Sequence, residues 1–102
     1  RGTLDVRAAT ITDEMCIAAA QALADIGAKG ASDKKVIPTM DHWELYPLEA
    51  TAVGMKAIEQ GIAGKEWEEK ELYKHAEHII RIARACTDNL YEKGCIPKAP
   101  PT

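Results

Sequence analysis

The chain has 102 residues, of which 46% are apolar and 28% charged, a balance that excludes a disordered chain and fits one globular domain or part of one. Its formal net charge is −3, and the lysines and arginines are scattered, so the sequence indicates no nucleic-acid partner. The longest uncharged stretch, Met15 to Ala24, spans ten residues, whereas a membrane helix needs about 20 apolar ones. A transmembrane span is therefore excluded.

Cys16, Cys86 and Cys95 are an odd number of cysteines at wide, irregular spacing. This usage favours reduced thiols in a cytoplasmic protein over a disulfide framework. The first residue is Arg1 rather than Met, and no signal peptide opens the chain. We therefore expect a truncated or proteolytic piece of a longer protein.

Residues Arg1 to Ala9 are too short and mixed for an assignment, because alternation suggests a strand and the composition favours a helix. A clear helix follows, capped by Thr12, with Ile11 packing on Cys16 as a hydrophobic staple and Gly27 as a left-handed stop. One apolar face of this helix is rich in alanine and consists of Met15, Ala19, Ala22, Leu23 and Ile26. We expect that face to pack on a broad, flat layer outside the chain.

The helical pattern breaks down from Ala28 to Tyr46. Turn-forming residues are followed there by a short apolar pair and a proline: Gly30, Ser32, Asp33, Val36, Ile37 and Pro38. The first three predict a turn, and the proline stops the pair from extending as an inner strand. The segment Met40 to Tyr46 is expected to be irregular or at most a helical turn. A connection this long often contacts a ligand or another domain.

A second helix is predicted to begin at Pro47 and to end at Gly61. Its apolar face consists of Ala50, Val53, Gly54, Ala57 and Ile58. Gly54 costs about 1 kcal/mol of helix propensity relative to alanine, so we expect another backbone to approach it closely.

The third and longest helix is predicted to start between Lys65 and Lys70 and to stop at Gly94. Apolar residues at alternating spacings of four and three form a seam along it: Leu72, Ala76, Ile79, Ala83, Cys86 and Leu90. Prolines then make an extended tail. The fold class is thus mostly α, with three main helices and irregular segments.

Several side chains could carry chemistry, and each has a more ordinary interpretation. His75 and His78 lie three apart on a helix, a spacing that suits a metal, but a solvated charged face is favoured. Asp41, His42 and Glu44 are neighbours in a loop whose side chains need not converge. The remaining candidates are interpreted as core, interface or helix-ending residues: Cys16, Cys86, Trp43, Trp67, Gly27, Gly30, Gly54, Gly61 and Gly64. Cys95 is expected to be the most exposed thiol. No catalytic, cofactor-binding or metal-binding residue is assigned.

Three segments resemble the malic enzyme family, in its small-subunit bacterial and archaeal type. They are Arg1-Gly2-Thr3-Leu4-Asp5-Val6-Arg7-Ala8 with Ile11-Thr12-Asp13-Glu14-Met15, then Ile37-Pro38-Thr39-Met40, and then Tyr46 to Gly61. Cys16 and the Pro-Thr-Met variant depart from the family pattern. The resemblance is good over residues 1–64, whereas 65–95 is a long C-terminal helix and 96–102 a proline-rich tail.

This resemblance implies that residues 1–102 are the C-terminal segment of an NAD(P)-binding domain, part of a Rossmann-like α/β domain in the parent enzyme. The parent would oxidise and decarboxylate malate to pyruvate and CO2 with NAD or NADP and Mg2+ or Mn2+. It would be a cytoplasmic homo-oligomer, a dimer, without a nucleic-acid or membrane partner. The catalytic lysine and tyrosine, the metal carboxylates and the glycine-rich loop of the family would all lie upstream, so this segment alone would bind no cofactor and be inactive.

An alternative interpretation is a free-standing helical interaction module. In that case the alanine-rich face and the seam from Leu72 to Leu90 would form a self-contained bundle core, which a chain of this length can bury. The reading frame upstream of Arg1 would distinguish the two, and a large exposed apolar patch on the first helix would favour the enzyme segment.

Overall fold

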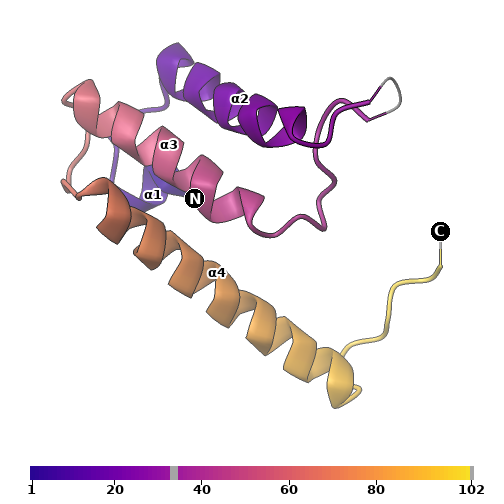
Figure 1. The fold of residues 1–102 in the computed structure, drawn as a ribbon. Helices are drawn as coiled ribbons and strands as arrows, with labels where there is room; N and C mark the ends of the chain where they lie inside the picture. Colours follow the sequence, from indigo (N-terminus) through magenta and orange to yellow (C-terminus); the bar gives the residue numbers. More distant parts are fainter. Residues whose placement is uncertain (33–34, 102) are drawn as a thin grey trace.

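The structure, a computed structural model, describes residues 1–32 and 35–101. This part of the chain forms four helices and no extended strand: α1 (Gly2–Asp5), α2 (Asp13–Ala28), α3 (Leu45–Glu59) and α4 (Glu69–Glu92). α3 is the central helix, because it contacts each of the other three. Figure 1 shows α2 and α4 on either side of it. The mostly helical fold class is confirmed.

The N-terminal segment, which the sequence left undecided, is a single helical turn followed by a sharp change of direction. Arg7 has a φ of 52°, in the left-handed region. The chain then passes beside the α3–α4 connection, where Ala8 and Ala63 form an isolated bridge. The Arg7 carbonyl accepts a bond of 3.0 Å from the Gly64 amide, and the Val6 carbonyl one of 2.9 Å from Lys65. Two segments far apart in sequence are thereby joined.

α2 begins as expected and ends differently. The Met15 amide donates a hydrogen bond of 3.2 Å to Thr12 Oγ1, which confirms the cap. Gly27 is not a left-handed stop: it lies inside the helix, which continues to Ala28. A Cβ at Gly27 would lie 2.9 Å from the Val36 carbonyl oxygen, so glycine is needed there for space. The expected turn includes Asp33, which lies outside the described residues.

α3 starts two residues before Pro47, which is buried in its first turn. Proline is tolerated there because the first N–H groups of a helix have no intrahelical acceptor. Gly61 has a φ of 72° just after the helix and Gly94 a φ of 69° after α4, so both predicted stops are confirmed.

Glycines allow α1 to lie directly on α3. A Cβ at Gly2 would overlap the carbonyl oxygen of Ala50 and lie 3.1 Å from the Gly54 amide nitrogen. A Cβ at Gly54 would lie 2.7 Å from a methyl of Leu72 and 2.9 Å from one of Val6, with the Gly2 oxygen at 3.6 Å. The expected close approach at Gly54 is therefore made by side chains as well as by a backbone.

The core is small and draws on every helix or its flank. Val6, Met15, Ala57 and Leu72 have no exposed surface and form one cluster. On α2, only Met15 of the predicted alanine-rich face is fully buried; the other four residues are half-buried. Because α2 packs on α3, a helix of this chain covers part of the face that was expected to meet an outside layer.

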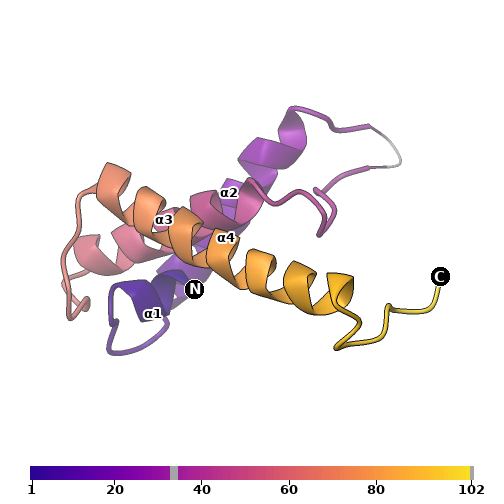
Figure 2. The same cartoon turned by 90° about the horizontal axis from the view of Figure 1, so that it is seen from below.

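The long seam of α4 is buried only in its first half. Leu72 and Ala76 are buried and Ile79 is half-buried, whereas Ala83, Cys86 and Leu90 are exposed. The two views agree that the C-terminal half of α4 extends away from the other helices (Figures 1 and 2). The described residues thus do not form the self-contained bundle core of an interaction module. Among them, no helix combines the length and apolar character that crossing a bilayer requires.

Candidate functional site

The most tightly held polar group is a carboxylate that the sequence analysis did not single out. The side chain of Asp5, in the single turn of α1, has no exposed surface. Its Oδ1 accepts a hydrogen bond of 2.8 Å from Arg1 Nε and lies 3.3 Å from His75 Nε2. Its Oδ2 is buried without a hydrogen-bond partner among the described residues. Asp5 therefore links α1 to α4 through a charged cluster.

Trp67 completes this cluster from the connection that precedes α4. Its Nε1 donates a hydrogen bond of 3.2 Å to the Asp5 carbonyl, and its ring stacks on His75 with centroids 4.7 Å apart. Lys65 Nζ lies 4.0 Å from the centre of the same indole ring. Trp67 is half-buried and packs against the core cluster; of the core and interface roles that the sequence left open, the contacts within this chain support the core one.

The two histidine groups that the sequence suggested are placed differently. His75 is engaged by Asp5 and Trp67, whereas His78 is exposed on α4. His42 Nε2 lies 3.6 Å from Glu44 Oε2, and both side chains are largely in solvent. Neither arrangement has the enclosed geometry of an acid–base site.

All three cysteines are free and exposed. This corrects the expectation that Cys16 and Cys86 behave as buried hydrophobes: the part of the α4 seam that carries Cys86 has no partner helix in the described chain. Cys16 and Ile11 are both exposed, so the expected hydrophobic staple is not a buried contact.

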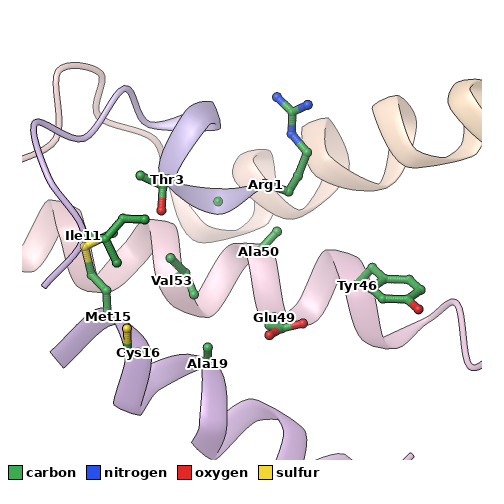
Figure 3. A pocket seen from close by; sticks show the side chains of 11 residues that line it. Arg1, Thr3, Ile11, Met15, Cys16, Ala19, Tyr46, Glu49, Ala50 and Val53 are labelled. Atoms are coloured by element: carbon green, nitrogen blue, oxygen red, sulfur yellow. The ribbon is translucent and has the colours of Figure 1, made fainter. Parts of the chain in front are cut away.

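A groove of about 310 Å³ lies between α1, α2 and α3. Figure 3 shows Met15, Cys16 and Ala19 of α2 facing Val53 and other residues of α3 across it. The polar lining is sparse and comes from separate elements: Arg1, Thr3, Tyr46 and Glu49. Such a lining suits an apolar contact better than bond chemistry.

A second groove, of about 520 Å³, runs between the start of α3 and the projecting half of α4. The Arg84 guanidinium lies 3.7 Å from the centre of the Trp43 ring, which meets Tyr46 edge-on at 5.0 Å. Trp43 is 37% exposed, so it is not a core residue.

Within residues 1–32 and 35–101, Glu14 is the one carboxylate whose pKa clearly departs from its ordinary value. It lies in the first turn of α2, where its own backbone N–H and the side chain of Gln60 hydrogen-bond it. Both bonds favour the ionised form and lower the pKa of Glu14. Because the residue is fully exposed, this marks a helix start rather than a reactive group.

The described residues do not supply a metal site, since nowhere do three or more histidine, cysteine, aspartate or glutamate side chains gather as potential ligands. Their isolated glycines also form no phosphate-binding loop between a strand and a helix. The groups present therefore do not fit a divalent cation or a dinucleotide.

Comparison with known proteins identifies relatives. No protein-family model matches the chain. The chain is 42% identical over 78 residues to a protein of Rickettsia prowazekii described as a probable NADP-dependent malic enzyme, in an alignment that covers 62% of this chain. It superposes on the crystal structure of Entamoeba histolytica malic enzyme with a TM-score of 0.90 and 40% identity over 97% of the chain. For malic enzyme from Pyrococcus horikoshii the TM-score is 0.80, with 35% identity over 90% of the chain.

These relatives are much longer than the chain. It covers 10% of the Rickettsia protein and 21% of each solved malic enzyme. The agreement extends over almost the whole chain, including α4, for which the sequence resemblance was vague. The resemblance found in the sequence is confirmed: the chain is a segment of the malic enzyme family.

Proposed function

We propose that the chain is the C-terminal segment of the NAD(P)-binding domain of an enzyme that oxidatively decarboxylates malate to pyruvate and CO2. The observation that carries this proposal is the superposition on the Entamoeba malic enzyme, with a TM-score of 0.90 and 40% identity over 97% of the chain. At that identity over so much of the chain, a shared role in the parent enzyme is the simplest explanation.

The segment acts as a structural part of the enzyme and not as its catalytic centre. The described residues gather no metal ligands and no phosphate-binding loop. The divalent cation (Mg2+ or Mn2+) and the NAD or NADP of the reaction are therefore held by the remainder of the enzyme. The isolated chain has no activity of its own.

The surface of the segment supports a covering role. Large apolar side chains on several elements are more than half exposed: Leu4, Ile11, Ile17, Val36, Ile37 and Met40. A surface with this many exposed apolar groups is typical of a segment that contacts further protein. The remainder of the enzyme, including its parallel sheet, covers part of this surface, and a second subunit of the dimer covers another part.

A cytoplasmic setting accompanies this role. Cys16, Cys86 and Cys95 are free, exposed thiols. Such thiols persist in a reducing compartment, where glutathione and thioredoxin keep them reduced.

The experiment compares two polypeptides: the 102-residue chain and the product of the complete reading frame that encodes it. Each is mixed with malate, NAD+ or NADP+, and Mn2+, and formation of the reduced cofactor is followed by absorbance. We expect turnover by the product of the complete frame and none by the chain. Turnover by the chain alone would refute its structural role, and inactivity of both polypeptides would refute the assignment to malate oxidation.

A further inference from the structure

The groove between the start of α3 and the projecting half of α4 has aromatic and aliphatic walls. Trp43 and Tyr46 contribute from the α3 side and Tyr91 from the end of α4, with Ile80 and Ala83 between them. Trp43 and Tyr91 are each 37% exposed, so part of each ring is open to contact. Grooves lined by aromatic rings bind proline-rich segments, because flat rings pack on pyrrolidine rings and the indole N–H and phenolic O–H donate to free carbonyls.

The chain itself contains a segment with the matching chemistry. Residues 96–101, called the proline tail below, read Ile-Pro-Lys-Ala-Pro-Pro. Proline fixes φ and has no N–H, which favours the polyproline II helix, and the three-residue period of that helix places Pro97 and Pro100 on one edge. Residues 97–101 are all exposed. The proline tail thus has the spacing of prolines that an aromatic groove binds.

The groove and the proline tail also agree in length. In a polyproline II helix, five steps of about 3.1 Å carry the tail from Ile96 to Pro101 over about 16 Å. The α4 wall of the groove runs from Ile80 to Tyr91, and at 1.5 Å per residue it is about 17 Å long. The tail is therefore long enough to contact the whole wall.

Charge favours the same pairing. Lys98 is the one charged residue of the proline tail, and Asp88 lines the groove. Neither takes part in the ion pairs found in the part of the chain that the structure describes. Both arginines of the groove are engaged, Arg1 by the carboxylate of α1 and Arg84 by the Trp43 ring. Asp88 is thus available to a lysine that enters the groove.

The path of the proline tail directs it to another molecule. The amides of Cys95 and Ile96 both donate to the Leu90 carbonyl, at 2.9 and 3.4 Å, and so fix the direction in which the chain leaves α4. Both views show the tail beyond the end of α4 and clear of the other helices (Figures 1 and 2). A tail held in this direction does not lie in the groove of its own chain.

We propose that the proline tail of one copy binds in the α3–α4 groove of a second copy, with its prolines on Trp43 and Tyr91 and Lys98 beside Asp88. In a two-fold dimer the second tail makes the same contact in return, so the exchange is reciprocal and closed. This inference deepens the covering role proposed above and rests on it for the second subunit, but it concerns assembly and not the reaction.

Photo-cross-linking of the product of the complete reading frame tests the exchange. Benzoylphenylalanine is introduced in place of Ala99, an exposed residue of the tail, and the protein is irradiated. We expect a covalent product of twice the subunit mass on a denaturing gel, joined to peptides that contain residues 43–46 or 80–91. Cross-links within one subunit would place the tail in its own groove, and cross-links to other segments would assign it another surface. Either result, or no cross-link, would overturn the proposal.

Charge reversal at exposed positions provides matched variants. K98E and D88K should each lower the yield of the cross-linked product about two- to fivefold, because an attraction between exposed charges becomes a repulsion. K98E/D88K should recover the yield, since the pair forms again with the signs exchanged. K70E, at an exposed lysine near the other end of α4, should leave it unchanged.

Unchanged yields in both single variants, or no recovery in the double variant, would contradict the pairing. The cross-link requires neither malate nor turnover. Loss of the cross-link in a protein that oxidises malate would therefore refute the exchange alone, and a cross-link in a protein that does not oxidise malate would refute the proposed reaction alone.

Discussion

Replacement of Gly2 by alanine is expected to separate α1 from α3. An added Cβ would overlap the Ala50 carbonyl oxygen and lie 3.0 Å from the Ala50 carbonyl carbon and 3.1 Å from the Gly54 amide nitrogen. These are backbone atoms of a central helix, so they cannot rotate out of the way, and α1 must shift instead. Overpacking of this kind costs about 1–3 kcal/mol, and the short α1 offers little helix propensity in return.

Alanine substitutions at two further glycines provide a comparison for the loss of stability expected in G2A. G54A introduces a Cβ that meets methyl groups of Leu72 and Val6, which can move slightly, and it gains about 1 kcal/mol of helix propensity. At Gly30 nothing lies within 4 Å of an added Cβ, so G30A should change stability by less than about 0.5 kcal/mol.

Urea unfolding followed by circular dichroism measures the free energy of unfolding of each variant. The expected order of destabilisation is G2A first, then G54A, then G30A. If G2A is as stable as the unmodified chain, then α1 does not lie on α3 as described, and the steric argument is wrong.

Three other predictions follow from burial, capping and charge. L72A should destabilise the chain by about 2–5 kcal/mol because Leu72 has no exposed surface, whereas L90A, at a residue 44% exposed, should cost less than about 1 kcal/mol in the same urea assay. T12A should cost about 1 kcal/mol through loss of the α2 cap, and T10A, at an exposed residue with no capping role, should cost little. The pKa of Glu14 is lowered from 4.5, chiefly by its own backbone N–H, so its ionised form stabilises the fold above that pH, and the contribution is lost as the pH falls through the lowered value. Thermal melts should therefore show E14Q less stable than the unmodified chain at pH 7, with a difference that shrinks as the pH is lowered; equal stability at pH 7, or a difference that does not change with pH, would contradict this assignment.

The helices were largely predictable because their signals are local. The Thr12 cap, the stop at Gly61 and the stop at Gly94 each depend on the conformation of a few neighbouring residues, and all three are confirmed. Gly27 was misread, because its role depends on the chain that returns past it at Val36. A glycine that ends a helix and one that makes room for another segment look alike in sequence.

Burial along α4 could not be predicted from periodicity. The seam repeats regularly to Leu90, but only the part up to Ile79 meets other helices of the described chain. Periodicity indicates which face is apolar and says nothing of where the neighbouring helix ends. Cys86 was therefore placed in a core that does not extend so far.

The charged cluster was missed for a related reason. Asp5 and His75 are brought together only by the packing of α1 on α4, and neither has a neighbour in sequence that marks the pair. The sequence nevertheless contained one indication. Asp5 lies between Leu4 and Val6, and Val6 is buried in the structure. A carboxylate in such a segment needs a hydrogen-bond partner when the segment packs.

The projecting half of α4 has a mechanical consequence. At a rise of 1.5 Å per residue, Glu92 lies about 24 Å along the helix axis from Ala76, the last fully buried residue of the helix. A rigid rod held at one end amplifies rotation, so a tilt of about 10° at the held end displaces Glu92 by about 4 Å. A small repacking around Leu72 and Ala76 that tilts α4 would therefore move the far end of the helix by several ångströms, together with any protein surface bound there.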